Sequence, residues 1–265
     1  MSSYFLKLFY ALVLLLLHAA GSILGFNLLP NSAEIKCIET ERQALLNFKQ
    51  GLRDDYDMLS TWRDDGNNRD CCKWKGSQCN NETGHVQTLH LPGHATQILT
   101  GALNISSLIA LEYIEHLDLS YNSFLGSHIP ELMASFTNLR YLNLSHCVFV
   151  GSIPSDLGKL THLQYLDLSD NHLDGELPYL LGKLTHLQYL DLSDNDLDGE
   201  LPYQLGNLSQ LRYLDLGANS FSGALPFQVG NLPLLHTLGL GGNFDVKSKD
   251  AEWLTNLSSL TKLKL

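Results

Sequence analysis

Tyrosine and aspartate side chains that could bind a ligand recur at one place in a repeated stretch of the sequence. They form two columns with a period of about 24 residues, His116, Tyr141, Tyr165, Tyr189 and Tyr213 in the first, and Asp118, Asp167, Asp191 and Asp215 in the second. Tyrosines are effective anchors at binding interfaces, and carboxylates attract basic groups. The columns therefore predict a surface for a ligand with basic groups. The alternative for each single residue is a structural role in strand packing and solubility.

The sequence contains no recognisable catalytic motif. We find no Gly-x-Ser-x-Gly, no His-Glu-x-x-His and no phosphate-binding loop, because the stretch at Gly158 lacks the required glycine-rich run. We also expect the eleven histidines not to cluster. We therefore predict no enzymatic activity, no metal site and no cofactor. The net charge of −11 disfavours binding to nucleic acid.

The columns belong to an internal repeat. Residues 159–178 and 183–202 differ at one position only, His172 against Asp196. The common frame, which extends in both directions, is L-x-x-L-x-L-x-x-N-x-L-x-G-x-(I/L)-P. A short fixed period predicts a solenoid, in which each repeat buries its leucines against its neighbours.

Each part of the frame has a structural interpretation. The L-x-L segment places two leucines on the inner face of a short strand, and the residue between them and the one after them point outward. The Asn is expected to bond backbone groups of neighbouring turns, and Cys147 occupies that Asn position in one repeat. We expect Cys147 to be buried, reduced and structural. Because Asp191 should point outward, we expect Asp191→Ala to leave folding intact.

The N-terminal part of the chain differs from the repeats. Residues 1–25 contain a short apolar run with small residues after it, which predicts a secretory signal peptide; an N-terminal membrane anchor is the alternative. Residues 26–85 are predicted to form a cap on the solenoid. Within it, Thr40 and Gln43 have the spacing of a helix capping box, and Leu45, Phe48 and Leu52 are expected to share one helix face.

Four cysteines in this cap predict two disulfides in a secreted chain. Adjacent cysteines seldom bond each other, so we favour Cys37–Cys71 and Cys72–Cys79. A zinc site is the alternative, but the segment lacks a Cys-x-x-Cys pair and suitably spaced histidines.

Three cap motifs and the repeat together resemble the plant leucine-rich repeat receptor-like proteins and kinases. The motifs are CIETERQALLNFK, LSTW and DCCKWKGSQC, and the subgroup of fungal-xylanase receptors is the most similar. The resemblance covers about residues 37–265, although Ser77 stands where the family usually has Val. It implies an α/β solenoid, a right-handed leucine-rich repeat superhelix with a parallel concave β-sheet and an N-terminal disulfide cap. Residues 86–265 would be about seven repeats, the last truncated.

The same resemblance implies extracellular ligand recognition through the concave face, in plant defence or development. The expected ligand is an extracellular protein, peptide or wall fragment, and the expected partner is a co-receptor kinase if the complete chain is membrane-anchored. Alternatives are a secreted inhibitor of cell-wall-degrading enzymes, similar to polygalacturonase inhibitors, and a non-functional truncated copy. Because related receptors continue further, we expect the sequence to be a fragment of a cell-surface protein; otherwise it would be secreted to the wall.

Two further sets of residues bear on recognition. Irregular positions suggest where specificity lies, namely His146, His172, Arg140 and Arg212. Asn-x-Ser/Thr sequons predict glycosylation at Asn81, Asn104, Asn143, Asn207 and Asn256. Asn143 falls in the aspartate column, so a glycan there would block part of the concave face.

Overall fold

The computed structural model describes residues 36–66, 68–224, 226–243, 245–246 and 256–265. Lys36–Leu265 form one compact unit. The predicted signal peptide, residues 1–25, lies outside the described residues, as does the start of the predicted cap. None of the helices in the described part of the chain is both long and apolar enough to span a membrane.

The cap begins with the helix α2 (Glu39–Gln50), which buries Leu45 and Phe48. The predicted capping box is wrong, because the helix starts at Glu39 and Ile38 is its N-cap without a side-chain hydrogen bond. The helix start is held by neighbouring parts of the cap instead: the Cys37 amide donates to Asp70 Oδ1 over 3.1 Å. Leu52 is also outside the helix, in the short strand β1 (Leu52–Arg53).

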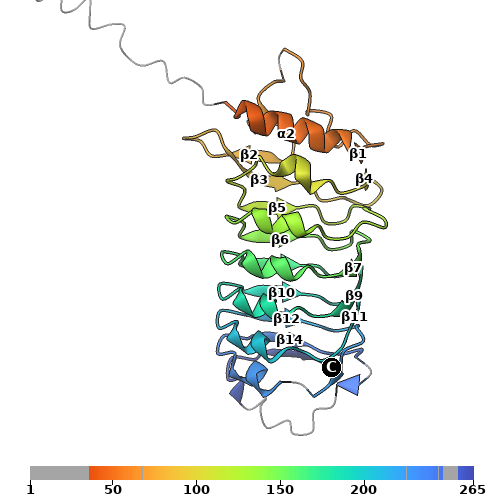
Figure 1. Ribbon diagram of the computed structural model, residues 1–265, viewed down its shortest axis with the longest axis vertical. Helices are drawn as coiled ribbons and strands as arrows, with labels where there is room; N and C mark the ends of the chain where they lie inside the picture. The colour runs from red at the N-terminus through yellow and green to blue at the C-terminus, as the bar shows by residue number, and fades with distance from the viewer. Residues whose placement is uncertain (1–35, 67, 225, 244, 247–255) are drawn as a thin grey trace, which may run out of the picture. The chain divides into compact units, whose positions relative to one another are not determined.

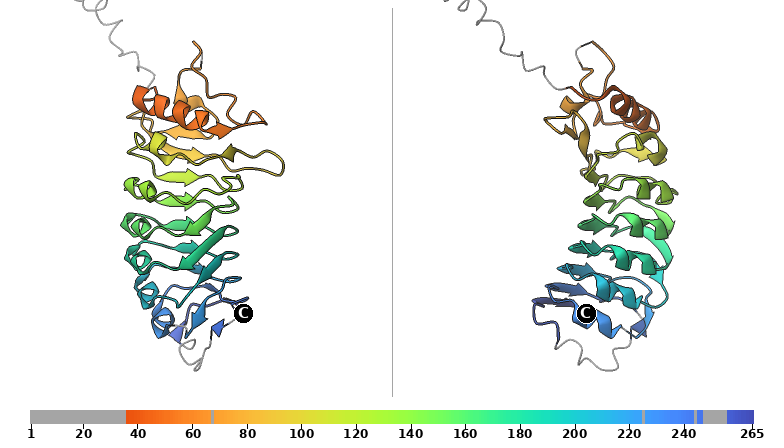
Figure 2. Two further views of the ribbon diagram at one scale, coloured as in Figure 1. Left: turned by 45° about the vertical axis from the view of Figure 1, so that its right-hand side comes forward. Right: turned by 60° about the vertical axis from the view of Figure 1, so that its left-hand side comes forward.

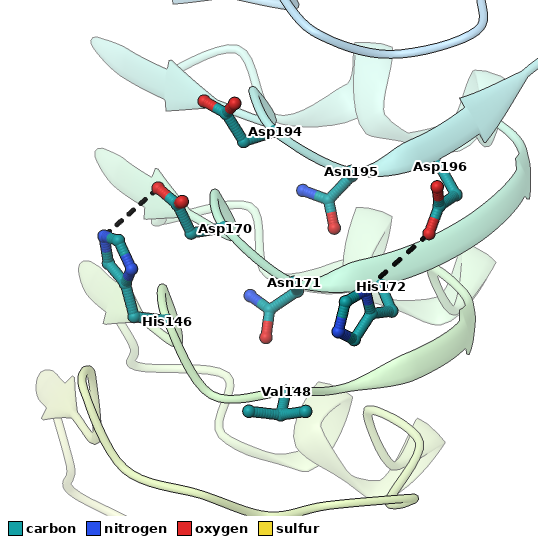
Figure 3. Close-up of a pocket in the computed structure, with 8 residues that line it drawn as sticks. All are labelled: His146, Val148, Asp170, Asn171, His172, Asp194, Asn195 and Asp196. Carbon is teal, nitrogen blue, oxygen red and sulfur yellow. Dashed lines mark ion pairs between the residues drawn. The ribbon is translucent and has the colours of Figure 1, made fainter.

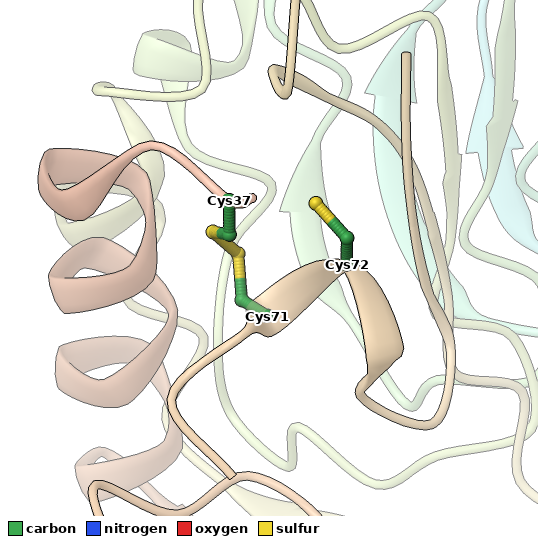
Figure 4. Close-up of side chains that lie close together, drawn as sticks. All are labelled: Cys37, Cys71 and Cys72. Carbon is green, nitrogen blue, oxygen red and sulfur yellow. A yellow bond between two sulfur atoms is a disulfide. The ribbon is translucent and has the colours of Figure 1, made fainter. Parts of the chain in front are cut away.

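Two disulfides hold the cap together, Cys37–Cys71 and Cys72–Cys79, in the pairing that we favoured. Figure 4 shows the bond between Cys37 and Cys71 beside α2. These sulfurs are therefore not available as zinc ligands. Trp62 and Trp74 stack in the same unit, with ring centroids 5.5 Å apart. Glu41 ties the cap to the first repeat, because its carboxylate accepts the Val86 amide over 2.7 Å.

The repeats form a nine-stranded sheet, whose strands follow one another down the stack in Figure 1. The cap strand β2 pairs antiparallel with β3, and all later pairs are parallel. Equivalent residues of neighbouring repeats are in register, for example Tyr189 with Tyr165 and Tyr213. The strands are β2 (Ser77–Cys79), β3 (Val86–His90), β5 (His116–Asp118), β6 (Tyr141–Asn143), β8 (Tyr165–Asp167), β10 (Tyr189–Asp191), β12 (Tyr213–Asp215), β14 (Thr237–Gly239) and β16 (Lys262–Lys264).

Smaller strands and 3-10 helices return the chain on the other side of each turn, as the two views of Figure 2 show. The strands are β4 (Thr100–Gly101), β7 (Val150–Ser152), β9 (His172–Glu176), β11 (Asp196–Asp198), β13 (Ser222–Gly223) and β15 (Asp245–Val246). The 3-10 helices are η1 (Cys71–Lys73) in the cap, then η2 (Ile105–Leu108), η3 (Glu131–Ser135), η4 (Ser155–Lys159), η5 (Tyr179–Lys183), η6 (Tyr203–Asn207) and η7 (Phe227–Asn231).

The Gly-x-(I/L)-Pro motif explains where these helices start. Its glycine adopts the left-handed region, with φ of 75° at Gly175 and 72° at Gly199, where other residues are strained. Its proline is the N-cap of the following 3-10 helix, as Pro178 is for η5 and Pro202 for η6. The motif therefore turns the chain at the same point in every regular repeat.

Leucines fill the core, and a polar ladder crosses it. Leu166, Leu190 and Leu214 are fully buried between the two sides of the turns. Asn171 donates to the carbonyls of Leu144 and Leu168, each over 3.0 Å, and its Oδ1 accepts the Phe149 amide over 3.0 Å. Asn122, Asn195, Asn219 and Asn243 make equivalent bonds. The predicted asparagine ladder is thus confirmed.

Candidate ligand-binding face

Aromatic rings form a continuous stack on the outer face of the nine-stranded sheet. We call this stack the aromatic strip; it contains His116, Tyr141, Tyr165, Tyr189 and Tyr213. Successive ring centroids lie 4.0 to 4.3 Å apart, with interplanar angles of 8° to 10°. The cause is the in-register pairing of the strands, which sets neighbouring residues of a column about 4.8 Å apart. All five side chains are half-buried, so their outer edges remain accessible.

The aspartates lie beside the strip but are far less accessible than we expected. Asp118, Asp167, Asp191 and Asp215 are only 4 to 8% exposed. Asp191 Oδ1 accepts the Ser193 amide and hydroxyl over 3.0 and 2.6 Å, and its Oδ2 accepts the hydroxyls of Tyr189 and Tyr213, each over 3.1 Å. The premise that the Asp191 side chain points freely to solvent is therefore wrong, and we now expect its loss to reduce stability. These carboxylates hold the strand-to-loop turn and orient the tyrosine hydroxyls.

Burial and the neighbouring carboxylates change the ionisation of this face. Burial, and secondarily the charges of nearby aspartates, raises the pKa of Tyr165, Tyr189 and Tyr213 well above the ordinary value. Burial also raises the pKa of Asp167. The tyrosines consequently remain neutral hydrogen-bond donors across the physiological pH range.

The side chain of Lys264 binds to this face at strand β12. The ammonium of Lys264 lies 2.5 Å from Asp215 Oδ2, 3.2 Å from the Tyr213 hydroxyl and 5.5 Å from the centroid of the Tyr213 ring. The hydrogen bond to Asp215 raises the pKa of Lys264. A Tyr-Leu-Asp strand can therefore accept a primary ammonium through a carboxylate, a hydroxyl and a ring face together.

The other end of the strip has a different composition. His116 stacks on Tyr141, and Asp118 Oδ2 lies 3.1 Å from Nδ1 of His90. Burial lowers the pKa of His116. The expectation that histidines do not cluster is wrong here, because the pairing of β3 with β5 brings together His90 and His116, which are distant in sequence.

A pocket lies at the edge of the sheet, where the chain leaves the strands. Figure 3 shows the residues around this space of about 450 Å³, which are His146, Val148, Asp170, Asn171, His172, Asp194, Asn195 and Asp196. His146 Nε2 lies 3.1 Å from Asp170 Oδ2, and His172 Nδ1 lies 3.8 Å from Asp196 Oδ2. Burial, and then the charge of Asp170, raises the pKa of Asp194. The arrangement can accept a cationic group.

Sequence reasoning selected His146 and His172 but missed the aspartates of this pocket. The available signal was the repeat position before the ladder residue, which reads Tyr121, His146, Asp170, Asp194 and Ala218. All five residues have positive φ, between 49° and 57°, so the backbone directs them to one edge. Arg140 and Arg212 are exposed beside the strands and lie outside this pocket, and Arg140 pairs with Glu115 over 3.4 Å.

The sequons fall in two kinds of environment. Asn81, Asn104, Asn207 and Asn256 are exposed. Asn143 is half-buried in the aspartate column, and its Oδ1 accepts the Ser145 amide and hydroxyl over 3.0 and 2.8 Å. Exposure thus favours glycosylation at the first four sites, and Asn143 acts here as a counterpart of the aspartates.

Comparison with known proteins identifies the repeats and the cap. Residues 119–265 match the model of a leucine-rich repeat region, and residues 38–80 match that of a leucine-rich repeat N-terminal domain. Receptor-like protein EIX2 of Solanum lycopersicum is 50% identical over 127 residues, which are 45% of this chain and 12% of the relative. Receptor-like protein EIX1 of the same plant is 46% identical over 128 residues, 44% of this chain and 12% of the relative. The chain thus matches only about an eighth of these relatives' length.

Solved structures show the same architecture. The Arabidopsis receptor kinase HAESA, in complex with the peptide hormone IDA and the co-receptor SERK1, superposes with a TM-score of 0.74 at 31% identity, covering 86% of this chain and 41% of HAESA. A plant ice-binding protein superposes with a TM-score of 0.72 at 26% identity, covering 87% of this chain and 79% of that protein. The right-handed solenoid with a parallel concave sheet and a disulfide cap is therefore the fold of this chain.

Proposed function

The chain belongs to the leucine-rich repeat family, and on this premise we propose that it recognises an extracellular ligand as part of a plant receptor-like protein. The aromatic strip is the observation that carries the proposal. Its rings are already stacked, and its hydroxyls are already oriented by aspartates, so a ligand would bind with little loss of side-chain freedom. A role in binding, rather than in catalysis, also fits a chain that has no catalytic motif.

We propose that the ligand carries lysine or arginine side chains. The contacts of the Lys264 ammonium with Tyr213 and Asp215 support this choice. Strands β8 and β10 have the same Tyr-Leu-Asp sequence, so they offer the same groups to a ligand. The net charge of −11 would favour the approach of a basic ligand. A peptide or a basic segment of a secreted protein has this chemistry.

The partners and the location of the chain are part of the same proposal. Receptor kinase HAESA binds a peptide hormone together with a co-receptor, which supports a peptide ligand and a co-receptor kinase for this chain. We propose that residues 1–25 direct the chain to the secretory pathway, that residues 26–85 are the cap and that residues 86–265 are the repeats. The exposed sequons would carry glycans at the cell surface, where the chain would act in defence or development.

The test is selection of peptides on the secreted full chain from a displayed random library. The expected result is enrichment of Lys- and Arg-containing peptides. Their affinity should fall at least about tenfold in Tyr165→Ala/Tyr189→Ala, because buried ring contacts and oriented hydroxyls are lost together. The variant Tyr165→Phe/Tyr189→Phe separates these contributions, since it keeps the ring stack and removes only the hydroxyls.

A matched control is available in the same two repeats. Tyr179 and Tyr203 are 60 and 61% exposed and begin η5 and η6, on the other side of each turn. Tyr179→Ala/Tyr203→Ala should keep full affinity. Peptides that bind every variant equally, or that require Tyr179 and Tyr203 instead, would contradict the proposal.

A further inference from the structure

Two histidines and one carboxylate converge at the cap end of the sheet face. One ligand atom each from His90, His116 and Asp118 lies within 4.8 Å of the others. His90 is the last residue of β3 and pairs with Asp118, while His116 is the first residue of β5. The side chain of His90 is 53% exposed, so the group opens to solvent, and that of Asp118 is 7% exposed.

This group replaces the arrangement that the later strands share. In β8, β10 and β12 the tyrosine hydroxyl donates to Oδ2 of the aspartate two residues later. In β5 the tyrosine is replaced by His116, and Oδ2 of Asp118 faces Nδ1 of His90 instead. The cluster therefore departs from the consensus sequence of the repeat. Two imidazoles lie beside the aspartate of β5, where the later strands have a tyrosine hydroxyl.

The surrounding residues hold two of the three groups in place. Asp118 Oδ1 accepts the Ser120 amide and hydroxyl over 3.0 and 2.7 Å, and Oδ2 faces Nδ1 of His90. His116 is stacked on Tyr141, with ring centroids 4.0 Å apart. Outer-shell hydrogen bonds that orient a ligating carboxylate are a regular feature of metal sites. The exposed ring of His90 is free to complete the geometry.

We propose that His90, His116 and Asp118 bind a divalent transition-metal ion of the Zn²⁺ class. Imidazole nitrogen and carboxylate oxygen are ligands that suit Zn²⁺, Cu²⁺ and Ni²⁺, and three protein ligands leave a position open to water or to a bound molecule. Metal–ligand bonds of about 2.0 to 2.1 Å place donors about 3.3 Å apart in a tetrahedron, and His90 Nδ1 and Asp118 Oδ2 are already 3.1 Å apart. The cluster adjoins the aromatic strip, because His116 belongs to both.

The neighbouring repeats supply variants that should fold and yet remove ligands. His116→Tyr introduces the residue that β6, β8, β10 and β12 carry at this place. Asp118→Asn copies Asn143, which still accepts the Ser145 amide and hydroxyl. His162→Gln is the control, since His162 is exposed and its Nδ1 lies 3.1 Å from the Thr137 carbonyl oxygen, away from the cluster.

The experiment is titration of the full chain with Co²⁺, followed by its visible absorption, and competition by Zn²⁺. The expected result is one equivalent of bound metal, with an affinity that falls more than about tenfold in both His116→Tyr and Asp118→Asn and is unchanged in His162→Gln. Absence of binding, or binding that both ligand variants retain, would overturn the proposal. Binding that is lost in His146→Gln but kept in His116→Tyr would also overturn it, by assigning the metal to the edge pocket.

Discussion

At the scale of single residues, polar groups of the repeat stabilise the turns through hydrogen bonds, both in the core and on the sheet face. Cys147 shows this in the core, where its Sγ donates to the carbonyls of Leu119 and Ser145 in place of a ladder asparagine. Asp191 shows it on the sheet face, where both of its oxygens are occupied. The environments of Cys147 and Asp191 lead to one prediction each.

Cys147 should be chemically inert in the folded chain. It is fully buried, and burial raises the pKa of its thiol to about 12. Because the thiolate is the nucleophile, the folded chain at pH 8 should react with iodoacetamide at least about a hundredfold more slowly than the denatured chain. Mass spectrometry of alkylated Cys147 measures this ratio. Similar rates in the two states would contradict the burial.

Asp191→Ala should destabilise the fold by about 1 to 3 kcal/mol, because it leaves the Ser193 amide and hydroxyl and the Tyr189 hydroxyl without their acceptor. The free energy of unfolding in urea measures the loss. Asp191→Asn should cost less, since Asn143 fills the equivalent position in β6. Asp198→Ala, at an exposed position of β11, is the control and should be close to neutral. Equal stability of Asp191→Ala and the parent would refute the role of this carboxylate.

At the scale of elements, neighbouring 3-10 helices approach one another closely at glycines, where no side chain intervenes. The 3-10 helices η4, η5 and η6 contain Gly158, Gly182 and Gly206 at equivalent positions. A Cβ at Gly182 would lie 2.5 Å from the Gln204 carbonyl oxygen and 2.6 Å from the Gln204 Cβ. Contacts this short force neighbouring elements apart.

Gly182→Ala should therefore destabilise the chain by about 1 to 3 kcal/mol, the usual cost of overpacking. Urea unfolding again gives the number. Gly66→Ala is the matched control, because a Cβ there meets nothing within 4 Å. A neutral effect of Gly182→Ala would mean that η5 and η6 separate without cost.

At the scale of the whole molecule, stability comes from contacts between successive turns, and the cap covers one end of their core. Buried Trp62 and Trp74 lie in this cap, and Cys37–Cys71 closes it over a sequence separation of 34. In such a stack each repeat contacts only its neighbours, so damage at one end should remain local.

Replacing Cys37 and Cys71 by serine should lower the stability of the cap by about 2 to 4 kcal/mol. Hydrogen exchange should show loss of protection in β2 and β3 while β8, β10 and β12 stay protected. The unchanged chain under the same conditions is the control. Simultaneous loss of protection in all strands would show that the solenoid unfolds as one cooperative unit.

The sequence by itself determined the period, the leucine core, the asparagine ladder and the solenoid. These features recur about every 24 residues, and the alternation of each strand between core and solvent fixes which residues of a regular repeat are buried. The disulfide pairing that we favoured agreed with the structure, although excluding a bond between adjacent cysteines leaves two of the three pairings open. The binding role of the columns and glycosylation of the sequons stay predictions.

Only the tertiary structure decided how accessible the polar columns are and which distant residues meet. Alternation places Asp191 on the outer side of β10, but the serine after it and the neighbouring tyrosines bury its oxygens. The group of His90, His116 and Asp118 depends on the pairing of β3 with β5. In this pairing Thr88 lies beside His116, a shift of 28 residues, whereas the regular repeats pair with a shift of 24. The register in which β3 pairs with β5 decides which residues of the two turns meet. The period of the sequence does not specify that register.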